Sequence, residues 1–386
     1  MLDAMTPGFL PDVAAAWESP ACVRRSTHGR VLPDDGSAVF GGWCAIDTRG
    51  LRSTGLRRFG SRARGALKAA AVAFVLVSAA GAVPGRALAT TPGRNGLIVF
   101  TAPTDAGNQL FTVRPDGTGL RQITHVAGDA GNVDWSANGR HIVFALGDET
   151  SARIAIARPD GSDLRVLPQP DGVFDDQPAF TPNGRKIYFE RFTVATNDDA
   201  IWSMAIDGSD QQRVVGPFPN GFVTDPNFSP DGMTMSFQGF DGSVVGPAPE
   251  LEPARGLFTA DPDGGNVHQI RPYTADETIK ADWAPNGRRL AVTENANHYR
   301  PDDSANIVTV RRDGSHPIQV TSFHDVDTNA YFGSYSPDGR WLVFRLEKDG
   351  LYGLYRIHPD GTHRQAILPL STLRPSLIDW GTSNDR

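Results

Sequence analysis

The residues of this sequence that could most readily do chemistry are adjacent aspartates in three widely separated places. They are Asp175-Asp176, Asp198-Asp199 and Asp302-Asp303. Calcium prefers several carboxylate and carbonyl oxygens at once, and aspartate-rich loops can supply them. The three pairs are therefore candidate calcium ligands. The alternative is that they are solvated surface carboxylates that promote solubility.

Histidines offer a second kind of metal chemistry. His298 and His324 lie in the same kind of polar segment as the aspartate pairs, and so does His125. Imidazoles gathered around a metal ion can support lyase or hydrolase chemistry. Separate parts of the chain would have to bring these histidines together, so ordinary surface histidines are the alternative interpretation.

Residues 90–386 contain no linear catalytic or cofactor motif. The serine nucleophile elbow, the H-E-x-x-H zinc motif, the P-loop and the dinucleotide fingerprint are all absent from this stretch. Both cysteines, Cys22 and Cys44, precede it, so it can form no internal disulfide and no thiolate metal site. We therefore expect no required cofactor, and calcium is the ion that the aspartates suggest.

Charge is distributed unevenly along the chain, whose net formal charge is -7. Residues 1–89 hold 11 Lys/Arg and 6 Asp/Glu, whereas the remainder holds 26 and 38. A body this acidic repels a phosphate backbone. Nucleic acid is therefore excluded as a partner.

The segment 51–89 has the order of a secretory signal. Five basic residues between Arg57 and Lys68 precede an uncharged run, Ala69 to Pro84, and Ala87-Leu88-Ala89 follows. This order predicts cleavage after Ala89. The run is shorter than the ~20 apolar residues that span a bilayer, so we expect no stable membrane span after cleavage.

The first fifty residues show no clear periodicity. We interpret residues 1–50 as an upstream extension that is absent from the natural product, with a disordered extension as the alternative. The exported protein is expected in the periplasm, at the cell wall or in the medium.

Two short patterns alternate from residue 90 to the end, which is the span of the predicted propeller. The first is an aromatic residue, a turn ending in Gly and a β-rich run, at 134–144, 179–189, 227–237, 282–292 and 334–344. The second is an Asp-Gly turn between two β-rich runs, at 110–124, 154–167, 202–215, 257–270, 308–320 and 354–368. A period in the forties made of four short strands is typical of propeller blades.

The two ends of the chain complete the count. Residues 95–100 match the second half of the pattern, and 378–381 match the first half. The C-terminal strand should therefore join the three N-terminal strands in one blade. The predicted fold is all-β, a six-bladed β-propeller with four antiparallel strands per blade and no open edge.

The units DWSANGR, SPDGR and RPDG resemble the WD-repeat-like propeller repeats of the TolB family, the periplasmic component of the Tol–Pal system. They also resemble the propeller domains of prolyl oligopeptidases and tricorn-type proteases. The resemblance covers about residues 93–386. The α/β domain that precedes the propeller in TolB has no counterpart between the predicted cleavage site and the first repeat. What the resemblance implies is an exported, monomeric binding or scaffold module with a protein or peptide partner at the cell envelope.

The strand order also predicts where a site would lie. Connections from second to third strands and from blade to blade emerge on one face, and these contain the long loops and the aspartate pairs. Long loops on a rigid scaffold are where binding usually resides. The alternative function is a metal-dependent lyase or hydrolase that acts on a polysaccharide or small ester at this long-loop face. Histidines clustered with carboxylates at the channel mouth would favour the enzyme.

Overall fold

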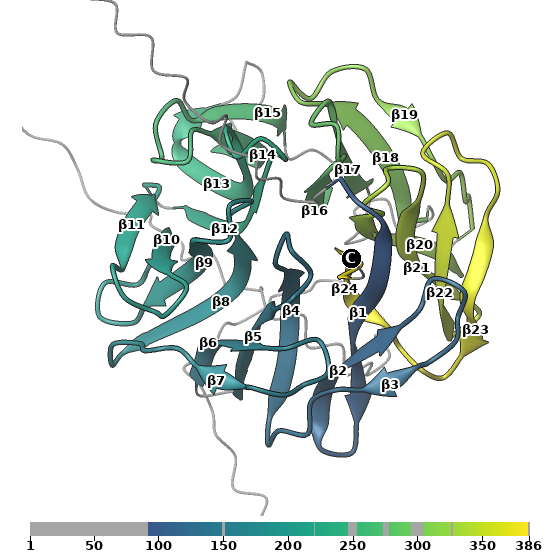
Figure 1. Ribbon diagram of the computed structural model, residues 1–386. Helices are drawn as coiled ribbons and strands as arrows, with labels where there is room; N and C mark the ends of the chain where they lie inside the picture. Colours follow the sequence, from purple (N-terminus) through teal and green to yellow (C-terminus); the bar gives the residue numbers. More distant parts are fainter. Residues whose placement is uncertain are drawn as a thin grey trace, which may run out of the picture. The chain divides into compact units, whose positions relative to one another are not determined.

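All elements in the described part of the chain are β-strands, and they form six four-stranded antiparallel sheets around a common axis (Figure 1). The computed structural model describes residues 92–148, 151–219, 221–245, 253–272, 278–294, 304–325 and 327–384. All of them belong to one of the two compact units of the chain, Ala80–Arg386. Within these residues no helix is long and apolar enough to cross a membrane. The all-β, six-bladed fold is confirmed. The predictions for residues 1–50 and 51–89 lie outside the described residues.

Each sheet is one blade, and its strands run in order from the axis outward. Blade I is β24 (Ser376–Thr382), β1 (Asn95–Thr104), β2 (Gly107–Val113) and β3 (Arg121–Gln122). Blade II is β4 (Asp129–Trp135), β5 (Ile142–Asp148), β6 (Ser151–Ala157) and β7 (Arg165–Val166). Blade III is β8 (Val173–Phe180), β9 (Lys186–Thr193), β10 (Asp198–Ala205) and β11 (Gln212–Val215).

The second half of the ring repeats this order. Blade IV is β12 (Phe222–Phe228), β13 (Met235–Val245), β14 (Pro253–Ala260) and β15 (His268–Pro272). Blade V is β16 (Thr278–Trp283), β17 (Arg289–Glu294), β18 (Asn306–Arg311) and β19 (Ile318–Gln319). Blade VI is β20 (Thr328–Tyr335), β21 (Leu342–Lys348), β22 (Leu351–Ile357) and β23 (Gln365–Ser371).

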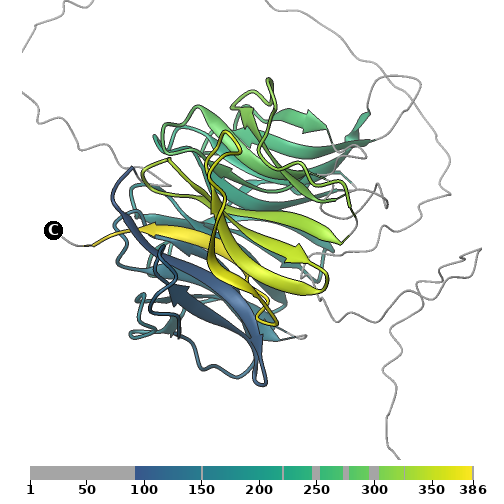
Figure 2. The ribbon, with the colours of Figure 1, turned by 90° about the vertical axis from the view of Figure 1, so that its right-hand side faces the viewer.

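Blade I closes the ring as predicted. The C-terminal strand β24 pairs antiparallel with β1, so that Trp380 lies opposite Ile98 and Asp379 opposite Val99. Figure 2 shows the yellow C-terminal strand beside the dark blue N-terminal strand. Trp380 and Ile378 are each 2% exposed. The last strand therefore contributes core residues as well as hydrogen bonds.

The Asp-Gly turns have the conformation that their sequence predicts. In the first, Gly117 has φ +84°, and its N–H donates to the Arg114 carbonyl at 2.8 Å. The Asp116 carboxylate accepts from the Thr118 N–H at 2.9 Å. In the second, a Cβ on Gly161 would lie 1.9 Å from the Ile123 carbonyl oxygen of the preceding blade. Glycine is therefore required there both for its φ and for close blade contact.

The core lies between neighbouring blades. Val99 and Leu110 of blade I pack with Trp135 and Phe144 of blade II in one buried cluster. The second strands are continuously apolar because both of their faces are covered, as in Ile142-Val143-Phe144. Burial between blades thus fixes the position of every inner strand.

Two of the aspartate pairs predicted to lie in long loops, Asp175-Asp176 and Asp198-Asp199, lie in strands instead. Asp175 and Asp176 belong to the inner strand β8, and Asp198 and Asp199 begin β10. The prediction of loops was wrong, because these polar stretches of sequence form paired strands. Regular pairing accepts these aspartates because their carboxylates find partners: Asp175 is ion-paired with Arg191, and Asp198 accepts from the Thr196 hydroxyl.

Four inner strands contain an irregular position three residues before the aromatic residue near their end. Asn132, Gln177, Asp225 and Leu377 have φ between +48° and +53°, and strand pairing shifts register beside each of them. Such bulges bend a strand and redirect its side chains. Asp225 belongs to a buried carboxyl cluster described below, and the Asn132 amide donates a hydrogen bond to that cluster.

Candidate functional site

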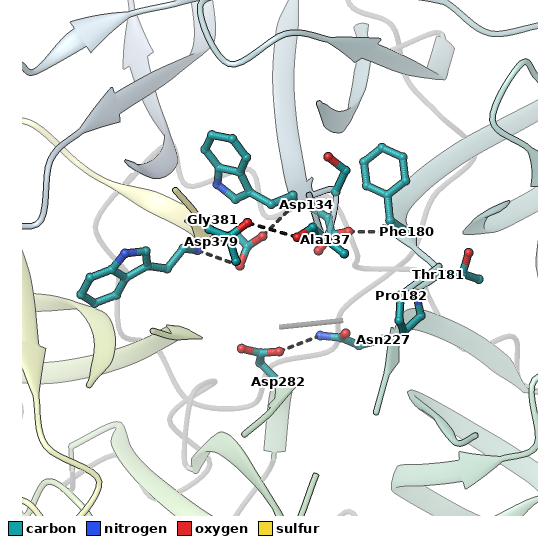
Figure 3. Close-up of a pocket in the computed structure, with 13 residues that line it drawn as sticks. Asp134, Ala137, Phe180, Thr181, Pro182, Asn227, Asp282, Asp379 and Gly381 are labelled. Carbon is teal, nitrogen blue, oxygen red and sulfur yellow. Dashed lines mark hydrogen bonds between the residues drawn. The ribbon is translucent and has the colours of Figure 1, made fainter. Parts of the chain in front are cut away.

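A shallow polar recess, partly open to solvent, lies at the axis where the inner strands end (Figure 3). Five blades contribute to this axial pocket, which is lined by Asp134, Trp135, Ser136, Ala137, Phe180, Thr181, Pro182, Asn227, Asp282, Asp379, Trp380, Gly381 and Thr382. Its rim includes the tight turns between first and second strands. The axial pocket therefore lies on the face opposite to the long-loop face, where we expected a site.

Carboxylates of the axial pocket hydrogen-bond from one blade to the next. Asp379 of blade I accepts from the backbone N–H of Trp135 in blade II, with Oδ2 2.9 Å from the nitrogen. Asp134 of blade II accepts from the N–H of Phe180 in blade III at 2.7 Å. We call this side-chain link from one inner strand to the next an inter-blade clasp.

Asp282 forms the densest clasp. Its Oδ2 accepts from the N–H of Tyr335 at 2.9 Å and from the Ser334 hydroxyl at 3.1 Å, both in blade VI. Its Oδ1 accepts from the N–H of Trp283 at 2.8 Å. The Asn227 amide of blade IV donates to this same Oδ1 at 3.3 Å and so links blade IV to blade V.

The clasp residues occupy one repeat position, immediately before the inner-strand aromatic. In chain order the six residues at this position are Asp134, Ala179, Asn227, Asp282, Ser334 and Asp379. Sequence reasoning treated them as ordinary blade residues and missed their role. The available signal was the dipeptide Asp-Trp, which recurs at this position in three blades.

The clasps decide what the pocket carboxylates can do. Both oxygens of Asp282 and of Asp379 already accept backbone N–H groups. Such bonds fix the orientation of each carboxylate and occupy lone pairs on both of its oxygens. The pocket carboxylates therefore act as structural links between blades.

A second group of carboxyl side chains lies between blades III and IV. It consists of Asp176 in β8, Glu190 in β9, Asp199 in β10 and Asp225 in β12. Asp176 accepts from the Asn132 amide at 2.7 Å, and Glu190 accepts from the Thr224 hydroxyl of blade IV. Oδ1 of Asp199 is buried without a hydrogen-bond partner. We call these four residues the carboxyl cluster.

Burial dominates the electrostatics of the carboxyl cluster. Burial, reinforced by the nearby carboxylates of Asp199, Asp176 and Asp225, raises the pKa of Glu190 well above its usual range. Burial, with a smaller contribution from Asp198, raises the pKa of Asp199 from its usual 3.8 to about 7. Asp199 therefore changes its protonation state near neutral pH.

Comparison with known proteins gives partial matches to TolB. No protein-family model matches the chain. A 78-residue segment, 20% of this chain and 16% of the relative, is 35% identical to Tol-Pal system protein TolB 1 of Novosphingobium aromaticivorans. A 160-residue segment, 41% of this chain and 52% of the relative, is 27% identical to an uncharacterized protein of Agrobacterium fabrum. The matches thus span about half or less of the length of these curated relatives.

Solved structures of other proteins share the fold of this chain. TolB from Acinetobacter baumannii superposes with a TM-score of 0.59 at 14% identity, covering 76% of this chain and 68% of that one. The fold is TolB-like. A putative TolB from Agrobacterium tumefaciens gives a TM-score of 0.52 at 14% identity and covers 72% of this chain and 89% of its own. The resemblance predicted from the repeats is confirmed at the level of fold.

The predicted metal ligands lie in different parts of this TolB-like propeller. Asp175 forms a buried bidentate ion pair with Arg191, with N–O distances of 2.6 and 2.7 Å. Asp198, which precedes Asp199, accepts a hydrogen bond from the Thr196 hydroxyl. His324 is exposed in the segment between β19 and β20, across the ring from blade III (Figure 1). The candidates outside the described residues are Asp302, Asp303 and His298.

The structure brings two of the predicted ligands, Asp176 and Asp199, together with Glu190 and Asp225 in the carboxyl cluster. Among the described residues, no three His, Cys, Asp or Glu side chains are arranged to hold a metal ion. Calcium binding stays a prediction.

Stability should increase as the pH falls from 8 to 5. Asp199 binds a proton more tightly in the folded state than in the unfolded chain, so raising the pH through about 7 lowers the free energy of unfolding. At about 1.4 kcal/mol per pH unit, the gain from pH 8 to pH 5 is about 2–3 kcal/mol. Urea denaturation at pH 8 and at pH 5 measures this change in the free energy of unfolding.

Asp199→Asn tests the assignment because it removes the titrating group but keeps its shape. We expect this variant to be more stable than the wild type at pH 8, with the difference closing at pH 5. Asp171→Asn, in an exposed loop of the same blade, is the control. Parallel pH profiles for the wild type and Asp199→Asn would contradict the assignment.

Proposed function

We propose that this chain is an exported TolB-like β-propeller that binds a protein or peptide partner at the cell envelope through its axial pocket. One observation carries the proposal: the pocket carboxylates are committed to inter-blade clasps. Asp379, Asp134 and Asp282 each accept a backbone N–H of the following blade. The pocket is therefore a rigid polar recess, and a preformed recess at the centre of a propeller face is suited to binding.

The comparisons support a partner of this kind. The partial sequence match is to a protein named for the Tol–Pal system, and the structural likeness is to TolB. The predicted leader at 51–89 supports export. A protein-binding propeller outside the cytoplasmic membrane fits both the likeness to TolB and the predicted leader.

The alternative function, a metal-dependent lyase or hydrolase acting on a polysaccharide or small ester, requires histidines beside carboxylates. This alternative places its site at the long-loop face, and among the described residues no three His, Cys, Asp or Glu side chains are arranged to hold a metal ion there. No observation in the described residues favours the enzyme over the binding module.

Blocking the axial pocket should abolish partner capture. Ala137→Trp places a large neutral side chain in the turn that lines the pocket, and Val194→Trp places the same side chain on the opposite face, where Val194 is 53% exposed. We expect crosslinking from the envelope fraction to recover a partner with the wild type and with Val194→Trp but not with Ala137→Trp. Equal recovery with both variants, or none with the wild type, would contradict the proposed function.

A further inference from the structure

Two histidine side chains lie against each other at the Asp-Gly turn of blade VI, between β22 and β23. His358 directly follows β22, and His363 lies before β23 on the other side of the turn. Their ring centroids are 4.5 Å apart, His358 is half-buried and His363 is exposed. Zinc lies about 2.0–2.1 Å from each imidazole nitrogen that binds it, so one ion can reach two rings that are this close.

Hydrogen bonds within the turn determine which nitrogen of His363 is free. The Thr362 hydroxyl donates to Oδ1 of Asp360 at 2.6 Å, and Oγ1 of Thr362 lies 2.7 Å from Nδ1 of His363. Hydrogen bonds from the side chain and the backbone N–H of Thr362 hold the pKa of Asp360 below its usual range, so this ionised carboxylate can only accept. The one hydroxyl hydrogen is therefore used, and Thr362 must accept from Nδ1–H of His363. Nε2 of His363 then carries the free lone pair that a metal ion requires.

His358 supplies the second imidazole, and Trp341 holds its ring in place. Trp341, which directly precedes β21, packs against His358 with ring centroids 4.2 Å apart. The Arg356 guanidinium lies 4.5 Å from the centroid of the Trp341 ring on which it stacks. Neither ring nitrogen of His358 has a hydrogen-bond partner among the described residues. The ring is thus positioned by packing, and its nitrogens stay available to a ligand.

We propose that His358 and His363 form a binding site for a divalent metal ion of the zinc type. Imidazole nitrogens suit such ions, whereas calcium and magnesium prefer oxygen ligands. Two protein ligands leave the remaining coordination positions to water. This pair is distinct from the histidines suggested by sequence, His298 and His324, and it lies at a tight turn rather than in a long loop. The inference goes beyond the proposed function and does not depend on it.

Calorimetric titration of the full chain with zinc chloride is the direct test. We expect His358→Gln and His363→Gln each to weaken zinc binding about tenfold or more. His316→Gln is the matched control and should leave zinc binding unchanged. His316 lies in the corresponding turn of blade V with the same hydrogen bonds through Ser315 to Asp313, but its ring contacts no second imidazole among the described residues. Failure of the wild type to bind zinc, or equal affinity in the wild type and both blade VI variants, would overturn the proposal.

Two further measurements separate a two-histidine site from general attraction of cations to an acidic surface. Excess magnesium should leave zinc bound, and displacement of zinc by magnesium would overturn the assignment to imidazoles. Thr362→Val keeps the shape of the side chain but removes the hydroxyl that orients His363, so it should weaken zinc binding several-fold. Ser315→Ala removes the equivalent hydroxyl in blade V and should have no effect. Equal losses of affinity in Thr362→Val and Ser315→Ala would contradict the site in blade VI.

Discussion

Deletion of residues 374–386 is expected to leave a protein that aggregates or fails to reach the folded state. The deletion removes β24 and exposes the paired edge of β1. It also removes the buried side chains of Trp380 and Ile378 and the clasp from Asp379 to blade II. Loss of one buried aromatic costs about 3–5 kcal/mol. Typical domains have only about 5–15 kcal/mol to lose.

Size-exclusion chromatography and thermal melting measure the outcome of this deletion. A synthetic peptide of residues 374–386, added in trans, should restore part of the monomeric fraction, which distinguishes loss of closure from a general folding defect. A truncated protein that stays monomeric with an unchanged melting temperature would show that the ring does not depend on the C-terminal strand.

Asp282→Ala should be the most destabilising single substitution among the clasp residues. Asp282 is 4% exposed, and its removal leaves the N–H groups of Trp283 and Tyr335 and the Ser334 hydroxyl without their acceptor. A buried donor left unsatisfied costs about 1–3 kcal/mol. We expect the free energy of unfolding to fall by about 3–5 kcal/mol in total.

Chemical denaturation at neutral pH checks the effect of Asp282→Ala. Asp360→Ala, which removes an exposed carboxylate from an Asp-Gly turn, is the matched control and should shift the denaturation midpoint far less. Similar shifts for the two variants would show that Asp282 acts as an ordinary surface residue rather than a link between blades.

The sequence predicts the fold well because the determinants of a blade are local. An Asp-Gly turn needs a residue that accepts positive φ, and Gly117 has φ +84° where the pattern requires it. Closure followed from counting, since 95–100 and 378–381 supply the two halves that the repeats lack. Neither inference required knowledge of how blades pack on each other.

The candidate site depends on contacts between blades, which sequence spacing does not contain. Asp134 and Phe180 are 46 residues apart in the chain, and their hydrogen bond exists only because blades II and III are neighbours. Glu190 stands in the strand Lys186–Thr193 beside Arg191 and has the sequence context of a surface residue. Its environment comes from Asp176, Asp199 and Asp225 on other strands. The sequence identifies such residues as polar but not as neighbours.

The clasps are not spread evenly around the ring, and their arrangement has a mechanical consequence. Blades I to III are joined by Asp379 and Asp134, and blades IV to VI by Asn227 and Asp282. The clasp position holds Ala179 in blade III and Ser334 in blade VI, and neither residue reaches the next blade in this way. The clasps therefore couple the blades in two sets of three. Blades III and IV are joined by other means, namely the hydrogen bonds from Thr224 to Glu190 and from Tyr188 to the Pro262 carbonyl and a shared core cluster. A variant that lacks a clasp should thus loosen contacts within one set of three blades before it affects the other set.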